Sequence, residues 1–421
     1  MRSRIRTIAV IGGGPGGAHC ARRLARRGFD VTLFEHRASF EKACGGGIPI
    51  RGIERFPFLD SPRLPGKTIR RCLLIAPSGR ETDLPLLDPL HVFSRADLHT
   101  FLLERAVEAG VALVRARVVS FARDGWTEGA GRAAGSGRAE GGGWILRTAT
   151  SGPAGDPPGG AACGPFDFLV AADGATGSAR RRLGCGPDGA GLAQGIGYYL
   201  PALSEDRITL KFYEGLDGYL WIFPRPGHSS AGICAELGGR PAAALKGLMD
   251  RFLAERFGAD LLARSERYAA LIPGAPRDPA SGRVHGEGWA LVGDAGRFVD
   301  PLTREGIYYA MLTGEMLADC LAARRPERYG AAWTRRCGRE LSWAARHARA
   351  FFDARFVERL VALCDRSPTA GRVLSDLIAG RQAYRDLKRR LLLNAPRIGM
   401  QIWARPGGGR GRSALRPARD S

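Results

Sequence analysis

The stretch from Ile8 to Glu35 restricts the fold of this 421-residue chain more than any other part of it. Residues 8–11 form a short apolar, β-branched run, which is typical of a buried parallel strand. Residues 18–27 continue with the apolar spacing of a helix, and residues 31–34 read as a second strand. The stretch is therefore predicted to be a complete strand–helix–strand unit.

Three glycines and an acid stand at defined points of this unit, in the spacing G-x-G-x-x-G. Gly12 allows a tight turn after the strand, and Gly14 lets the backbone approach a pyrophosphate at the helix N-terminus. Gly17 allows the helix to pack closely on the strand, and Glu35 can accept hydrogen bonds from a ribose. The pattern predicts a bound dinucleotide, but Glu35 alone does not separate FAD from NAD.

The strand-and-turn pattern occurs twice more. Residues 166–172 form a buried strand that ends directly before Asp173, and residues 289–292 form another that ends at Gly293 and Asp294. An acid at the carboxyl end of a parallel strand lies where such sheets bind ligands. A helix is predicted from Tyr308 onward, so the segment after Gly293 and Asp294 also brings a helix N-terminus to the same ligand.

Residues 207–237 change the character of the chain. Apolar and polar residues alternate on either side of a glycine turn, and Tyr219, Trp221 and Phe223 fall on one face. This pattern indicates an antiparallel sheet with an aromatic face. The face is either a packed core or a wall against an apolar ligand.

Residues 51–92, by contrast, are rich in proline and predict irregular structure with one strand at residues 72–76.

A short loop, Cys44-Gly-Gly-Gly-Ile-Pro49, lies between these regions. Its small residues can bring the backbone against a flat ring. The other interpretation is a flexible loop with an incidental buried thiol, and the residues alone leave both open.

The formal net charge is +21, and the last quarter, from Arg324 to Ser421, holds 23 Lys or Arg against 8 Asp or Glu. Such asymmetry favours an anionic partner, namely a lipid surface, an acidic protein or nucleic acid. Because only five of the basic residues are lysines, a compositional bias toward arginine explains the charge equally well. Residues 381–393 combine basic and apolar side chains, which suits a membrane surface or packing on the body of the protein.

The nine cysteines show no paired C-x-x-C spacing, so neither a metal site nor a disulfide framework is expected. No apolar run is long enough to span a bilayer, and the first strand begins within a few residues of the start. These features predict a cytoplasmic protein, with the inner membrane face as a second option.

Three separated motifs resemble FAD-dependent oxidoreductases of the aromatic-hydroxylase fold: the glycine fingerprint with Glu35, the turn at Asp173-Gly174, and residues 293–295 with 305–307. Within that fold, Cys44-Gly-Gly-Gly-Ile-Pro49 and Tyr219-Leu-Trp-Ile-Phe-Pro224 resemble the geranylgeranyl reductase family. Gly177 and Leu216 depart from the patterns of this family, which leaves the subfamily open.

The resemblance implies an α/β (mixed α+β) fold in which a Rossmann-like FAD-binding domain carries an inserted antiparallel-sheet substrate domain. The FAD-binding domain would comprise residues 1–60, 90–185 and 280–325. The sheet domain would comprise 61–89 and 186–279, followed by a helical region at 326–400 and a disordered basic tail at 401–421.

The resemblance also implies the site. Its expected cofactor-binding residues are Gly12, Gly14, Gly16, Gly17, Glu35, Cys44, Gly45, Arg95, Val119, Asp173, Gly293, Asp294, Gly306 and Ile307. The expected catalytic residues are Cys44, as proton donor or redox gate, with Tyr219 and Trp221 as the wall for a prenyl chain.

Members of this family reduce isolated double bonds of prenyl chains, so the expected reaction is hydride transfer from reduced flavin together with a proton. No second G-x-G-x-x-G follows a strand, so the electron donor, NADPH or reduced ferredoxin, is expected to bind only transiently. The nearest alternative is a flavin-dependent monooxygenase or halogenase of the same fold. A non-catalytic basic protein that binds membrane or nucleic acid is disfavoured, because charge does not explain three cofactor motifs.

Overall fold

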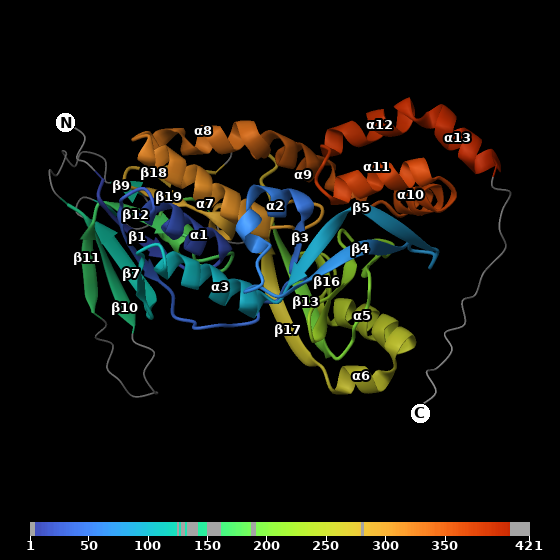
Figure 1. The fold of residues 1–421 in the computed structure, drawn as a ribbon, viewed down its shortest axis with the longest axis horizontal. Coiled ribbons are helices and arrows are strands. Elements are labelled where there is room, and N and C mark those ends of the chain that lie inside the picture. The colour runs from blue at the N-terminus through green and yellow to red at the C-terminus, as the bar shows by residue number, and fades with distance from the viewer. Residues whose placement is uncertain are drawn as a thin grey trace.

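A computed structural model describes residues 5–123, 126–127, 131–132, 142–149, 161–186, 191–278 and 282–404. One sheet in this part of the chain has the order β18-β19-β12-β1-β2-β6 and is parallel except for β18 (Figure 1). Its strands are β1 (Thr7–Ile11), β2 (Asp30–Phe34), β6 (Ala112–Val114), β12 (Phe168–Ala171), β18 (His285–Gly286) and β19 (Trp289–Leu291). The three strand ends predicted to face a ligand therefore lie side by side.

Helices cover this parallel sheet. Helix α1 (Pro15–Ala25) follows β1 and packs against α3 (Arg95–Val107) and α7 (Ile307–Ala322). Ser94 caps α3 by accepting a hydrogen bond from the Asp97 amide at 3.3 Å. Because β1 is buried almost completely, its apolar run forms the centre of the core, as expected of a parallel strand.

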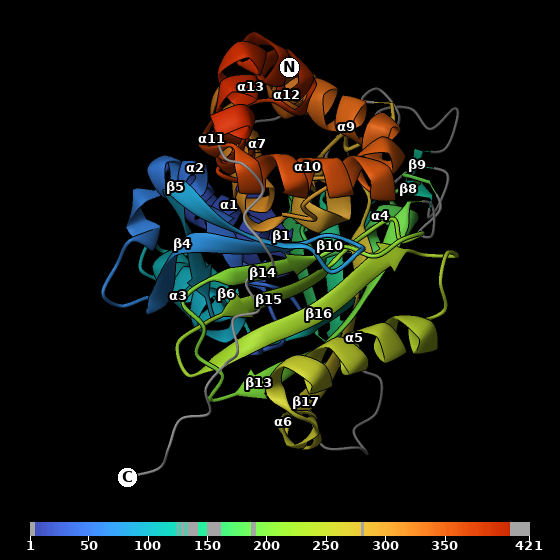
Figure 2. The same ribbon diagram turned by 90° about the vertical axis from the view of Figure 1, so that its right-hand side faces the viewer.

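A second sheet has the order β17-β13-β16-β15-β14-β4-β5-β3 and is antiparallel except between β14 and β4. It is formed by β3 (Gly47–Pro49), β4 (Gly66–Ile75), β5 (Glu81–Phe93), β13 (Leu192–Pro201), β14 (Ile208–Lys211), β15 (Leu220–Pro224), β16 (His228–Glu236) and β17 (Glu266–Pro273). Helix α5 (Ala242–Phe257) covers one face, and α10 (Ala354–Arg366) and α11 (Pro368–Ile378) cover the other (Figure 2). This sheet is thus buried on both sides.

The prediction of irregular structure at residues 51–92 was wrong, because β4 and β5 form a long hairpin there. Two prolines in β5 argued against a strand. Pro85, however, lies where β5 pairs only with β4, and β3 joins it only at residues 90–92. Proline is tolerated at such a free edge, so the alternation of buried Thr82, Leu84 and Leu86 determined the structure. The second sheet consequently includes β3 and extends to Phe93, beyond the predicted limits of 61–89.

Smaller elements complete the body. Strands β7 (Arg117–Arg123), β10 (Trp144–Ala149) and β11 (Ala162–Phe166) form an antiparallel sheet, and β8 (Trp126–Thr127) pairs with β9 (Gly131–Arg132). Short helices are α2 (Ile50–Arg55), α4 (Ala179–Arg182) and α6 (Ala259–Ala263). Single turns lie at Pro57–Leu59, Gly293–Gly296, Pro326–Arg328 and Tyr384–Asp386.

The last described segment is helical, as predicted. It consists of α8 (Tyr329–Trp333), a π-helical turn (Thr334–Gly338), α9 (Arg339–Phe351), α10, α11, α12 (Leu387–Leu393) and α13 (Ala395–Ala404). Residues 401–404 belong to α13, which corrects the predicted tail boundary at residue 401, and the rest of that tail lies outside the described residues. None of the helices seen here is both long and apolar enough to cross a bilayer.

Candidate active site

The glycine fingerprint has the geometry that its sequence predicts. Gly12 has a φ of 97°, and a Cβ on it would lie 2.4 Å from the Ala172 carbonyl oxygen, so only glycine fits the turn. A Cβ on Gly17 would lie 1.9 Å from the Gly12 carbonyl oxygen, which shows how closely α1 approaches β1. A Cβ on Gly14 would meet nothing within 4 Å. The backbone at Gly14 therefore faces open space at the N-terminus of α1.

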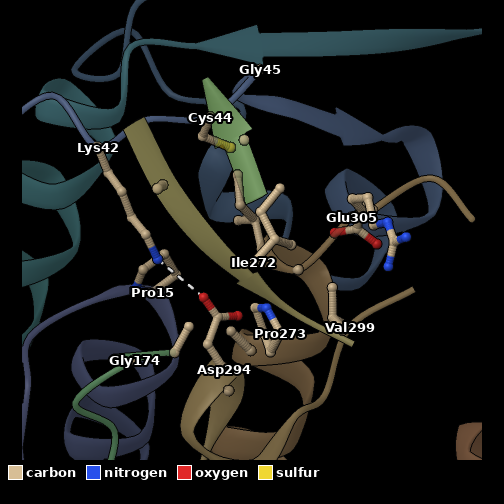
Figure 3. Close-up of a pocket in the computed structure, with 18 of the residues that line it drawn as sticks. Pro15, Lys42, Cys44, Gly45, Gly174, Ile272, Pro273, Asp294, Val299 and Glu305 are labelled. Carbon is tan, nitrogen blue, oxygen red and sulfur yellow. Dashed lines mark hydrogen bonds and ion pairs between the residues drawn. The ribbon is translucent and has the colours of Figure 1, made fainter. Parts of the chain in front are cut away.

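One cavity of about 1010 Å³ begins at this point. All the predicted cofactor-binding and catalytic residues line it, although they come from nine separate stretches of the chain. Figure 3 shows Lys42 reaching across it to Asp294, with 3.0 Å between Lys42 Nζ and Asp294 Oδ2. The structure brings these residues together, while their individual roles stay predictions.

The near end of the cavity fits FAD. Glu35 lies at the end of β2, is almost fully buried, and accepts hydrogen bonds from the amides of Gly13 (2.8 Å) and Arg37 (2.9 Å). The Nε atom of Arg95 is buried and has no hydrogen-bond partner among the described residues. The open backbone at Gly14 and the unpaired nitrogen of Arg95 suit the pyrophosphate of a dinucleotide. The carboxylate of Glu35 suits its ribose.

The cysteine loop lies against the aromatic strand. A Cβ on Gly47 would lie 2.7 Å from Phe223 Cε1, and one on Gly45 would lie 3.2 Å from the same ring. Gly46 has a φ of 82°, and a Cβ on it would lie 2.3 Å from the Phe93 carbonyl oxygen. The glycines are therefore required because Phe223 and Phe93 pack directly on the loop.

Arg225 holds this loop in place, although no sequence pattern predicted this role. Its side chain is 0% exposed and forms an ion pair with Glu41, which is 21% exposed. It also donates hydrogen bonds to the carbonyl oxygens of Cys44 and Gly45, and Ser230 Oγ donates to Cys44 O at 2.9 Å. The carbonyl groups of Cys44 and Gly45 are therefore held by Arg225, which directly follows β15, and by Ser230 of β16.

The network continues from Glu41 into α3. Glu41 accepts hydrogen bonds from Ser94 Oγ (2.6 Å) and from the amides of Arg95 (2.8 Å) and Ala96 (3.1 Å). Burial by itself would raise the pKa of Glu41, but Arg225 and these hydrogen bonds lower it below its ordinary value. Glu41 thus links the cysteine loop to the helix that carries Arg95. Arg225 follows a strand and belongs to no periodic sequence pattern. Its role therefore becomes visible only in the folded structure.

The far end of the cavity is apolar. Tyr219, Trp221 and Phe223 line it from the sheet, as predicted. The opposite wall comes from the C-terminal helices, which sequence reasoning did not place in the site: Phe351, Phe352, Phe356, Val357, Leu360, Val361, Leu374, Leu377 and Ile378. The Tyr219 hydroxyl donates a hydrogen bond to the Thr303 carbonyl oxygen, whereas Trp221 Nε1 has no partner among the described residues.

A buried acid, Glu305, also lines the cavity. Glu305 accepts hydrogen bonds from the Tyr308 amide (2.7 Å) and from Arg51 (3.2 Å). Burial raises the pKa of Glu305 to about 7, although Arg51 and the Tyr308 amide act in the opposite direction. This side chain was missed because its sequence context, Arg-Glu-Gly-Ile, indicated only a cofactor turn.

Comparisons with known proteins agree with this geometry. Residues 10–41 match the model of an NAD(P)-binding Rossmann-like domain. The chain is 26% identical over 372 residues to digeranylgeranylglycerophospholipid reductase 2 of Methanopyrus kandleri, which covers 82% of this chain and 86% of that protein.

Two solved structures show the fold. A geranylgeranyl bacteriochlorophyll reductase-like protein of Thermoplasma acidophilum has a TM-score of 0.72 and 18% identity, covering 92% of this chain and 99% of that one. The flavin-dependent brominase Bmp2 has a TM-score of 0.62 and 18% identity, covering 93% of this chain and 99% of that one. The predicted fold class and the resemblance to geranylgeranyl reductases are confirmed, and the protein is an FAD-dependent oxidoreductase.

Proposed function

We propose that this oxidoreductase saturates C=C bonds of a polyprenyl chain. The observation that carries the proposal is the single cavity, in which an FAD cradle at one end continues into a long apolar space at the other. A flexible hydrocarbon chain fits such a space, because its burial is driven by the apolar area removed from water. The name of the Methanopyrus relative supports the same substrate class.

Each part of the cavity has a role in this reaction. When bound, reduced FAD supplies the hydride. Cys44 lines the cavity on the loop that packs against Phe223, and there it serves as proton donor or redox gate. Tyr219, Trp221 and Phe223 hold the chain in place and keep water from the alkene.

The test is anaerobic reoxidation of the reduced protein by prenyl diphosphates, prenyl quinones, ether lipids and chlorophyll precursors. We expect the flavin absorbance to return with at least one prenyl lipid, and mass spectrometry to show the gain of two hydrogens for each bond reduced. A flavin that stays reduced with every lipid would contradict the proposal.

The electron donor is proposed to be NADPH or reduced ferredoxin, bound transiently. The basic surface suits an acidic carrier protein, since complementary charge speeds association. Anaerobic mixing with NADPH separates the two, because rapid bleaching of the flavin excludes a strict requirement for ferredoxin.

The pH dependence of reoxidation should identify the proton donor. If Glu305 donates the proton, its protonated fraction falls as the pH rises through about 7, so the rate should fall over the same range. Glu305→Gln should then abolish this fall. A decline near pH 7 that persists in Glu305→Gln would assign the proton to another group.

Membrane contact is proposed through α12 and α13. Leu392, Leu393, Met400 and Trp403 are 63%, 70%, 68% and 86% exposed, and the exposed Lys388, Arg389 and Arg397 lie among them. Apolar side chains beside basic ones suit an anionic bilayer. Leu387, the first residue of α12, lines the cavity, so this surface adjoins the space proposed for the prenyl chain.

Leu393→Ser/Trp403→Ser should therefore lose most of its binding to vesicles of phosphatidylglycerol and phosphatidylcholine in co-sedimentation. The matched control is Val107→Ser/Leu237→Ser, whose residues are each 48% exposed elsewhere, and it should bind as the unaltered protein does. Equal sedimentation of the two variants would exclude this surface.

A flavin-dependent halogenase or monooxygenase is the second candidate, because the flavin-dependent brominase has a similar fold. Oxygen uptake coupled to a hydroxylated or halogenated product would support this candidate.

A further inference from the structure

Glu305 belongs to a cluster of charged and hydroxyl groups in the cavity wall. Arg51 of α2 donates hydrogen bonds from Nη2 to Glu305 Oε2 (3.2 Å) and to the Tyr309 hydroxyl (3.1 Å). The Arg51 guanidinium also lies over the rings of Tyr308 and Tyr309, 4.8 and 5.1 Å from their centres. Its Nε atom has no hydrogen-bond partner among the described residues. Arg51 is therefore the cation that faces Glu305.

Asp300 is the second acid of this cluster and is only 2% exposed. Its Oδ1 atom accepts hydrogen bonds from the amides of Leu302 (2.9 Å) and Thr303 (3.0 Å), and its Oδ2 atom accepts one from the Tyr384 hydroxyl (2.7 Å). The Asp300 amide donates to the Glu305 carbonyl oxygen at 2.9 Å, which closes the turn between the two acids. Within the described ranges Asp300 forms no ion pair. The cluster thus joins two carboxyl groups to one guanidinium group.

This cluster adjoins the residues expected to bind FAD. Glu305 directly precedes Gly306 and Ile307, and a Cβ on Gly306 would lie 3.2 Å from Asp294 Oδ1. Cys44, Asp294 and Glu305 surround the same space (Figure 3). A proton on Glu305 is therefore held in the cavity proposed for the flavin and the alkene.

Glu305 can gain or lose this proton near neutral pH. Burial raises its pKa to about 7; Arg51 and the Tyr308 amide act against this shift, and Asp300 acts with it. A further negative charge in the cavity would raise the pKa of Glu305 again. Burial also raises the pKa of the other titratable side chains around Glu305 and Arg51, which keeps them neutral near pH 7: Tyr308, Tyr309, Cys337 and Tyr384.

We propose that Glu305 takes up a proton when the bound FAD is reduced, so that the site holds the hydride and the proton of alkene reduction together. This inference rests on the proposed function, which consumes both. Two electrons and one proton, supplied through NADPH or reduced ferredoxin, leave one added negative charge on FAD, and a proton from water on the Glu305 carboxylate balances it.

The return step balances in the same way. One alkene carbon accepts the hydride and the other accepts a proton, which leaves Glu305 directly or by way of the Cys44 thiol. FAD is then oxidised, Glu305 is again a carboxylate, and the net charge of the site is the same before and after the transfer. Glu305 thus serves as the store of the proton.

The test measures the midpoint potential of the protein-bound FAD against pH, in anaerobic equilibrium with dyes of known potential. Above about pH 7, where Glu305 begins as a carboxylate, the potential should fall more steeply with pH in the unaltered protein than in Glu305→Gln. The difference should approach one proton for each two electrons. Glu340→Gln is the matched control, because Glu340 pairs with Arg385 outside the cavity, and its slope should equal that of the unaltered protein.

Variants of Arg51 provide a second measurement should Glu305→Gln bind FAD poorly. Arg51→Met removes the cation that lowers the pKa of Glu305, so the steeper range should begin at a higher pH, whereas Arg51→Lys should keep it near pH 7. Equal slopes in the unaltered protein and Glu305→Gln, or a range that does not move in Arg51→Met, overturn the proposal and leave prenyl reduction standing. If the slopes differ as expected but no prenyl lipid reoxidises the flavin, proton uptake by Glu305 is supported and the proposed function fails.

Discussion

Cys44→Ala is expected to bind FAD as the unaltered protein does and to lose most of its prenyl-dependent reoxidation. The FAD cradle is formed by β1, α1 and β2, so removing the thiol leaves it intact. A positioned proton donor contributes about 10²- to 10⁴-fold to a rate, and the loss should fall in this range if Cys44 donates the proton. The measurement is flavin reoxidation by a prenyl lipid under anaerobic conditions, with flavin absorbance as the check on cofactor content.

Two further variants sharpen the result for Cys44. Cys44→Ser retains a hydroxyl donor and should recover part of the rate. Cys163→Ala removes a half-buried thiol on β11, outside the cavity, and should change nothing. Unchanged turnover of Cys44→Ala would remove the thiol from the mechanism while leaving the rest of the proposed function in place.

The sequence predicted the parts of the fold whose signals are local. The strand–helix–strand unit at residues 8–35 combines a buried apolar run with glycines in turns, and both act within a few residues of each other. The aromatic face at Tyr219, Trp221 and Phe223 followed from simple alternation. Asp173 and Asp294 were expected near the ligand because each follows a parallel strand, and the carboxyl ends of parallel strands lie at the same edge of the sheet.

The parts that could not be predicted depend on contacts between distant segments. The C-terminal helices enter the cavity through apolar faces that any core helix would show. Arg225 and Ser230 look like ordinary polar residues, yet they hold the carbonyl groups of Cys44 and Gly45, and Glu41 pairs with Arg225. Their role arises only when β15, β16, α3 and the loop are brought together, which no local pattern encodes.

Substitution of Arg225 is therefore expected to cause a large decrease in the free energy of unfolding. Arg225→Met leaves the Glu41 carboxylate largely buried and without its cation, and such a loss costs about 3–5 kcal/mol in the free energy of unfolding. Because Glu41 retains 21% exposure, we expect a value near the lower end, measured by urea denaturation of the holoprotein. Arg63→Met is the control, since Arg63 is 52% exposed in its ion pairs with Glu104 and Glu108. Its loss should change the free energy of unfolding little, because ion pairs exposed to water are weak.

Stability alone would not show that Arg225 positions the cysteine loop, so the double variant and the rate are both needed. Glu41→Gln/Arg225→Met should be less destabilised than the sum of the single variants, because the two side chains interact directly. Arg225→Lys keeps the charge but not the fork that contacts Glu41, Cys44 and Gly45, so it should restore stability more than it restores kcat. If instead kcat and stability recover together in Arg225→Lys, charge alone holds the loop and the hydrogen bonds to its carbonyls are dispensable.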